Sequence, residues 1–175
     1  PEVEHARPLE KHEKTALMEK LKTYGGTTTV RNAIQSMLYS MLRTAEIRRM
    51  EWGFVDFEEK IIKFPKASRR LKQERTMKKN RVHIVPMSFQ LLELMQQQKA
   101  ITGDQKYVFA SPYKRDCMLS RTAINKMLTY VGLSQITAHD FRATASTDLN
   151  GKGYKSDWIE AQLAHADDNK TRASY

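Results

Sequence analysis

The sequence predicts a mostly helical α+β domain that carries one small three-stranded antiparallel sheet. Apolar residues recur at helical spacing in the first third of the chain and again after residue 87. Between these parts, the chain is rich in β-branched and turn residues, and prolines at positions 65 and 86 bound this region. The 175 residues are enough for one domain with its own core.

The first third of the chain predicts two helices and a short third one. The first begins near Glu10 and ends where Gly25 and Gly26 follow the last residue of its apolar face. The second is buried and reaches to about Met41. A short third helix is expected to start near Thr44, whose hydroxyl could cap it.

The middle and the last third complete the predicted fold. Strands are expected at Lys60–Phe64, at about Gln73–Met77 and at Arg81–Val85. Helices follow, one from about residue 88, one opened by Ser120, one with Thr137 as its N-cap and Asp140 completing a capping box, and one opened by Ser156. We expect residues 1–9 to be a linker and residues 10–175 to be the domain.

The chain is strongly basic, and most of its excess charge lies in one segment. Its net charge is +10, while ten Lys or Arg and one acid give the segment Lys60–Arg81 a net charge of +9. A concentrated basic hairpin favours nucleic acid as the partner, with a merely solvated hairpin as the alternative. The residues that we expect to contact DNA are Arg69, Arg70, Lys72, Arg75, Lys79 and Arg81.

Other features of the composition narrow the class of protein. Cys117 is the only cysteine, so no intrachain disulfide forms and a reducing compartment is expected. No apolar run approaches the roughly 20 residues of a membrane span, and the start lacks a signal-peptide pattern. Because the chain opens on proline instead of methionine, we expect it to be a piece of a longer protein.

Two pairs of residues suggest a site for a phosphate group. His139 and Arg142 are three residues apart in the first turn of a predicted helix, where free N–H groups favour an anion. Arg43 is followed three residues later by Glu46, which could hold the guanidinium in a bidentate pair. Taken singly, each pair also fits an ordinary solvated face or a structural salt bridge.

Four segments in order carry a resemblance to a known family. They are LRTAEIRRMEW, MKKNRVHIVPMS, HDFRATAST and LAHADDNKTRASY. Together they resemble the catalytic domain of the tyrosine recombinases, and most closely the integrases of phages and genomic islands. The resemblance extends from about residue 10 to residue 175, and it implies the fold of that domain.

The resemblance implies a role for each matching residue. It assigns as catalytic Arg43, Lys78, His139, Arg142, His165 and the nucleophile Tyr175, with Glu46 as the acid that supports Arg43. Two departures stand out: Met41 occupies a position where glycine is frequent, and His165 precedes Tyr175 by ten residues, one more than in many members. The neighbouring Lys79 leaves the choice of the catalytic lysine open.

The implied reaction is DNA cleavage and rejoining through a 3′-phosphotyrosyl link, without metal or cofactor. The partner is double-stranded DNA, on which the full-length protein is expected to form a tetramer in the bacterial cytoplasm, at the nucleoid. An accessory directionality factor is possible, and the isolated domain is expected to be monomeric. Core-binding and arm-binding domains of the family have no counterpart in these residues. A regulatory DNA-binding module and a type IB topoisomerase are the alternatives.

Overall fold

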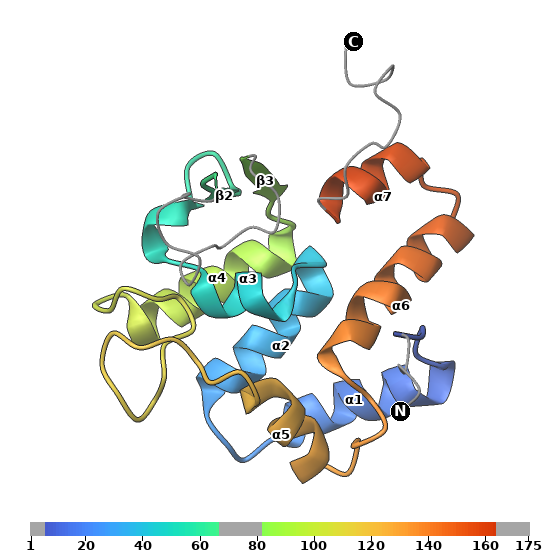
Figure 1. Ribbon diagram of the computed structural model, residues 1–175, viewed down its shortest axis with the longest axis horizontal. Coiled ribbons are helices and arrows are strands. Elements are labelled where there is room, and N and C mark those ends of the chain that lie inside the picture. Colours follow the sequence, from blue (N-terminus) through green and yellow to red (C-terminus); the bar gives the residue numbers. More distant parts are fainter. Residues whose placement is uncertain (1–5, 67–81, 164–175) are drawn as a thin grey trace.

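The computed structural model describes residues 6–66 and 82–163 (Figure 1). The predicted strand at about Gln73–Met77 lies outside these ranges. Within them the elements, in chain order, are α1 (Lys11–Thr23), α2 (Thr28–Ser40), α3 (Thr44–Arg49), the 3-10 turn η1 (Trp52–Phe54), β1 (Val55–Asp56), β2 (Ile61–Phe64), β3 (His83–Pro86), α4 (Phe89–Thr102), α5 (Ala123–Tyr130), α6 (Ala138–Gly151) and α7 (Ser156–Gln162).

Helix α2 lies in the middle of the helical part, and other elements pack around it (Figure 1). Its apolar residues are buried, among them Ala33, Ile34 and Met37. Helices α3, α4, α5 and α6 all contact α2, so a near-complete ring of neighbours explains why it is apolar on more than one face. The C-terminal end of α2 therefore has a fixed place relative to both α3 and α6.

The sheet has three antiparallel strands in the order β1-β2-β3. Ile62 pairs with Val85 and Phe64 pairs with His83, and all four side chains are buried on one face. The fold class predicted from the sequence, mostly helical with a small antiparallel sheet, is confirmed. The strand β1 was not predicted, because two residues are too short to show an alternating pattern.

Several predicted boundaries were wrong by one to three residues. Lys60 is not in a strand, because its φ of 55° places it in the turn before β2. Helix α5 starts at Ala123, not at Ser120, since the residues in between form a turn in which the Ala123 amide donates to the Ser120 carbonyl. Helices α3 and α7 start at Thr44 and Ser156 as predicted, but Thr44 does not cap α3, because the N-cap is Arg43.

The predicted start of α6 is confirmed. Thr137 is the N-cap, and the Asp140 carboxylate accepts hydrogen bonds from the Thr137 amide at 2.7 Å and from its hydroxyl at 3.0 Å. Asp140 is buried, so these bonds compensate for removing its charge from water. No helix in the two described ranges is long and apolar enough to cross a membrane.

Candidate active site

The turn between α2 and α3 places the first predicted catalytic arginine. Met41 ends α2 in the left-handed region, at φ 59° and ψ 17°, and its amide donates to the Met37 carbonyl. That conformation explains why glycine suits this position, since a side chain there costs roughly 1–2 kcal/mol. Met41 is buried against Ile159 and Leu163 of the α7 region. Burying a methionine contributes about 1.5–3 kcal/mol, which offsets the strain.

Arg43 is held by Glu46 in two ways. One carboxylate oxygen of Glu46 accepts from the Arg43 backbone amide at 2.8 Å, and the other accepts from Nη1 at 2.9 Å. The ion pair that the sequence predicted is present, but it is not the bidentate guanidinium pair that we expected, because one oxygen caps the helix instead. The Glu46 side chain is 1% exposed and that of Arg43 is 25% exposed. The carboxylate thus lies behind the guanidinium and fixes its direction.

Arg142 reaches the same turn from α6. Its Nη1 donates to the Met41 carbonyl, and its Nη2 donates to the Leu163 carbonyl at 2.9 Å. The side chain of Gln162 donates to the Ser40 carbonyl at 2.8 Å, which ties the end of α7 to the end of α2. The ends of α2 and α7 and the start of α3 therefore meet around one guanidinium of α6.

The charges around Arg142 favour an anion. The pKa of Arg142 is lowered to about 10, mainly by burial and then by the charge of Arg43, while the carboxylates of Glu46 and Glu160 oppose the shift. Arg142 stays protonated at neutral pH, because even the lowered value lies well above 7. Its bonds to Met41 and Leu163 are to neutral carbonyls, so a phosphate placed between the two arginines would relieve their repulsion.

His139 lies on the same helix as Arg142 but has different neighbours. It is exposed in the first turn of α6 and lines a cavity of about 400 Å³ together with Arg7, Asn125 and Gln135. Neither Arg43 nor Arg142 lines that cavity. The structure thus joins Arg43, Glu46 and Arg142 in one site, with His139 one helical turn away from Arg142.

The other predicted site residues lie outside the described ranges. They are Lys78, His165 and Tyr175 of the catalytic set, and Arg69, Arg70, Lys72, Arg75, Lys79 and Arg81 of the DNA-binding set. Their roles remain predictions from the sequence.

A second group of arginines was not predicted. Arg48 of α3 donates from Nε to the Leu119 carbonyl at 2.6 Å. Burial lowers the pKa of Arg48, and the nearby charges of Arg121 and Arg49 lower it further. These three arginines come from α3 and from the segment before α5, so they meet only in the folded chain. The adjacent pair at 48–49 in the LRTAEIRRMEW segment was the one signal for them in the sequence.

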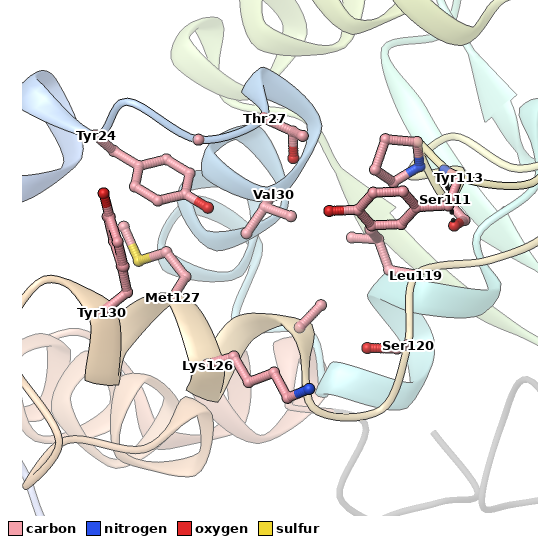
Figure 2. A pocket seen from close by; sticks show the side chains of 13 residues that line it. Tyr24, Thr27, Val30, Ser111, Tyr113, Leu119, Ser120, Lys126, Met127 and Tyr130 are labelled. Carbon is pink, nitrogen blue, oxygen red and sulfur yellow. Dashed lines mark hydrogen bonds between the residues drawn. The ribbon is translucent and has the colours of Figure 1, made fainter.

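The pocket in Figure 2 is separate from the arginine site. It has a volume of about 440 Å³, and in the view Tyr24, Met127 and Tyr130 lie across from Tyr113 and Leu119. The rings of Tyr24 and Tyr130 meet edge to face, with centroids 6.2 Å apart. None of the predicted site residues in the described ranges lines this pocket, so it does not bear on the chemistry proposed below.

Comparison with known proteins decides the family. The sequence model of the phage integrase family matches residues 7–175, which is nearly the whole chain. The chain belongs to the phage integrase family. Membership of this family confirms the resemblance to the tyrosine recombinases that the sequence motifs indicated.

Relatives and solved structures agree with this membership. The integrase-family chain is 39% identical to prophage integrase IntZ of Escherichia coli K12 over 142 residues, which cover 80% of the chain and 33% of that relative. It is 32% identical to prophage integrase IntA of the same strain over 160 residues, which cover 91% of the chain and 37% of that relative. The chain thus spans about a third of the length of these relatives.

A solved structure shows the same fold. The Tn1549 transposon integrase, in complex with circular intermediate DNA, matches with a TM-score of 0.75 over 95% of this chain and 61% of its own. Its sequence identity is 15%, so this likeness concerns the fold alone.

Proposed function

We propose that this chain is the catalytic part of a site-specific DNA recombinase that integrates and excises a mobile element. The observation that carries the proposal is the arginine site, in which Glu46 orients Arg43 beside the half-buried Arg142. Family membership over residues 7–175 supports it, since the matched relatives are integrases. Two fixed cations beside each other suit the charge of a phosphodiester in its transition state.

In the proposed reaction, the phenolic oxygen of Tyr175 attacks the phosphorus of the scissile phosphodiester. The new bond joins Tyr175 to the 3′ phosphate as the bond to the 5′ oxygen breaks. Arg43 and Arg142 bind the non-bridging oxygens, on which negative charge grows. Lys78 gives its proton to the leaving 5′ oxygen, and His139 and His165 help to favour the phenolate of Tyr175. Attack by a 5′ hydroxyl on the phosphotyrosyl link then reseals the strand without ATP.

A suicide substrate tests the proposal. On a nicked half-site the short 5′ fragment diffuses away after cleavage, so the reaction stops at the covalent adduct. We expect an adduct that survives denaturing electrophoresis and forms equally well in EDTA. No adduct would favour a regulatory DNA-binding module, and cleavage that depends on added magnesium would indicate a different mechanism. Relaxation of supercoiled DNA without strand exchange between duplexes would favour the topoisomerase alternative.

The role of Lys78 is open to a direct chemical test. A substrate with a bridging 5′-phosphorothiolate releases a thiolate, which leaves without a proton. We expect Lys78→Ala to cleave the ordinary substrate poorly and the phosphorothiolate at close to the rate of the unmodified protein. Rescue of Lys79→Ala instead of Lys78→Ala would transfer the role to the neighbouring lysine.

Binding to DNA is expected to be dominated by phosphate contacts. The basic segment 60–81 and the group of Arg48, Arg49 and Arg121 supply cations for them. We expect these 175 residues alone to bind cognate and scrambled duplexes with similar Kd. The log of the binding constant should fall with the log of salt with a slope of about −0.9 for each phosphate neutralised. Tight binding that is selective for sequence and insensitive to salt would contradict this.

The larger assembly follows from the proposed reaction. Exchange of strands between two duplexes requires four cleavages, so we propose that the full-length protein acts as a tetramer on DNA, in the bacterial cytoplasm at the nucleoid. An accessory factor that sets direction would act on that assembly. The domain alone is expected to be a monomer without DNA, which sedimentation would measure.

A further inference from the structure

One face of α6 is fixed by the segment that leads into α1. Three of its polar residues, Asp140, Thr144 and Asp148, are four residues apart and so lie on one side of the helix. Asp140 Oδ1 accepts from the Arg7 amide at 3.1 Å. Thr144 Oγ1 accepts from the Leu9 amide at 2.8 Å. Asp148 receives both hydrogen bonds of 2.7 Å from the ammonium of Lys14 in α1.

The contact between Leu9 and Thr144 is buried, the contact between Arg7 and Asp140 is partly buried, and the ion pair of Lys14 and Asp148 is more exposed. Leu9, Asp140 and Thr144 are each less than 10% exposed, and Leu9 belongs to the main core. The ion pair of Lys14 and Asp148 is about 40% exposed and lies at the other end of α6. We call residues 7–9 the strap, since they run along α6 beside its first two turns, near α1 (Figure 1).

The strap is itself held from its other side. The Arg7 guanidinium donates to both oxygens of Glu13, at 2.7 and 2.6 Å, and the Glu10 amide donates to the same carboxylate at 3.0 Å. The hydrogen bond from Arg7 is the main reason that the pKa of Glu13 is lowered to about 2. Glu13 is buried, so the start of α1, the strap and the first half of α6 form one hydrogen-bonded unit.

Arg142 of α6 faces the other way. At about 100° per residue, Arg142 lies roughly opposite Asp140 and Thr144, whereas His139 lines the cavity that Arg7 and Asp140 also line. On the site side, Arg142 binds two backbone carbonyls, which belong to the ends of α2 and α7. The Arg142 side chain is long, so these bonds alone do not fix the rotation of α6 about its own axis, and the contacts on the other faces of α6 contribute to it.

We propose that Asp140 and Thr144 are positioning residues, through which the strap sets the rotation of α6 and hence the placement of Arg142 and His139 against Arg43. The inference rests on the proposed function, because it concerns the geometry of that reaction. A misplacement of about 1 Å in a catalytic group can lower a rate about 100-fold, so small rotations of α6 matter. Asp140 also caps its own helix, whereas the Thr144 hydroxyl has one further bond, to the Asp140 carbonyl at 2.7 Å, so Thr144 is the residue to change.

The test compares Thr144→Val with Thr144→Ser and with Asp148→Asn. Valine has the shape of threonine but leaves the buried Leu9 amide without its acceptor, whereas serine keeps the hydroxyl. Asp148→Asn weakens the other link between α1 and α6, and so is the matched control. The first readout is the rate constant of adduct formation at saturating half-site DNA. The second is amide hydrogen exchange of residues 140–142, measured without DNA.

We expect Thr144→Val to slow adduct formation by about 10- to 100-fold, with a Kd for DNA within about threefold of the unmodified protein. Exchange of residues 140–142 should quicken by about tenfold or more. Thr144→Ser and Asp148→Asn should each keep the rate of adduct formation and the exchange of residues 140–142 close to those of the unmodified protein. If Thr144→Val does not fold, Glu13→Gln loosens the strap from the α1 side and should have the same effects, only smaller.

Two outcomes would overturn the inference. In one, Thr144→Val leaves rate and exchange unchanged. In the other, Thr144→Val and Asp148→Asn slow the reaction equally and in proportion to their loss of Tm, which would show a contribution to overall stability alone. If the unmodified protein forms no adduct, the proposed function fails, while the exchange of residues 140–142 still decides whether the strap fixes α6.

Discussion

A Tyr175→Phe variant is expected to form no covalent adduct with a nicked half-site, while it binds the same DNA with an unchanged Kd. Phenylalanine keeps the ring but lacks the oxygen that attacks phosphorus in the proposed reaction. No other group replaces it at comparable rate, since the adduct requires that specific nucleophile in line with the leaving oxygen. The measurement is denaturing electrophoresis of labelled DNA, with a parallel gel-shift titration.

Tyr154→Phe is the matched control for this change. Tyr154 follows α6 and is 52% exposed, so losing its hydroxyl should leave adduct formation as it was. An undiminished adduct in Tyr175→Phe would refute the assignment of the nucleophile. Loss of the adduct in Tyr154→Phe alone would move the assignment to that residue.

Arg43→Ala and Arg142→Ala are each expected to lower the cleavage rate constant by about 10²–10³-fold at saturating DNA, which corresponds to about 3–4 kcal/mol. The reason is that the charge on the non-bridging oxygens grows in the transition state, so both arginines act more strongly there than on the bound substrate. The Kd should rise by less than about tenfold. Single-turnover cleavage and equilibrium binding separate the two effects.

Structural side effects differ between the two positions. Arg142→Ala also removes the donors to the carbonyls of Met41 and Leu163, so its Tm must be compared with that of the unmodified protein. Arg121→Ala is the control for simple loss of positive charge, because Arg121 is exposed and belongs to the second arginine group. Arg121→Ala should weaken binding to DNA and leave the cleavage rate constant unchanged. Equal losses of affinity and rate in Arg43→Ala would show that Arg43 only holds the DNA.

Features that depend on neighbours along the chain could be predicted from the sequence alone. The spacing of Arg43 and Glu46 placed a carboxylate behind a guanidinium, and Thr137 with Asp140 marked the start of α6. Both are contacts over three residues at a helix start, where geometry follows directly from spacing. Helical periodicity gave the order of the helices and the fold class, because the period of apolar residues reports the face that is buried.

The way in which these local pieces meet became visible only in the folded chain. The partners of Arg142 are the backbone carbonyls of Met41 and Leu163. Every residue has such a carbonyl, so the sequence does not indicate which ones accept a hydrogen bond. The strap contacts Thr144 across 135 positions, through an amide that every residue except proline possesses. Contacts of this kind depend on the packing of whole helices. For that reason the sequence named the two arginines and the partner of Arg43, while the structure showed what holds Arg142.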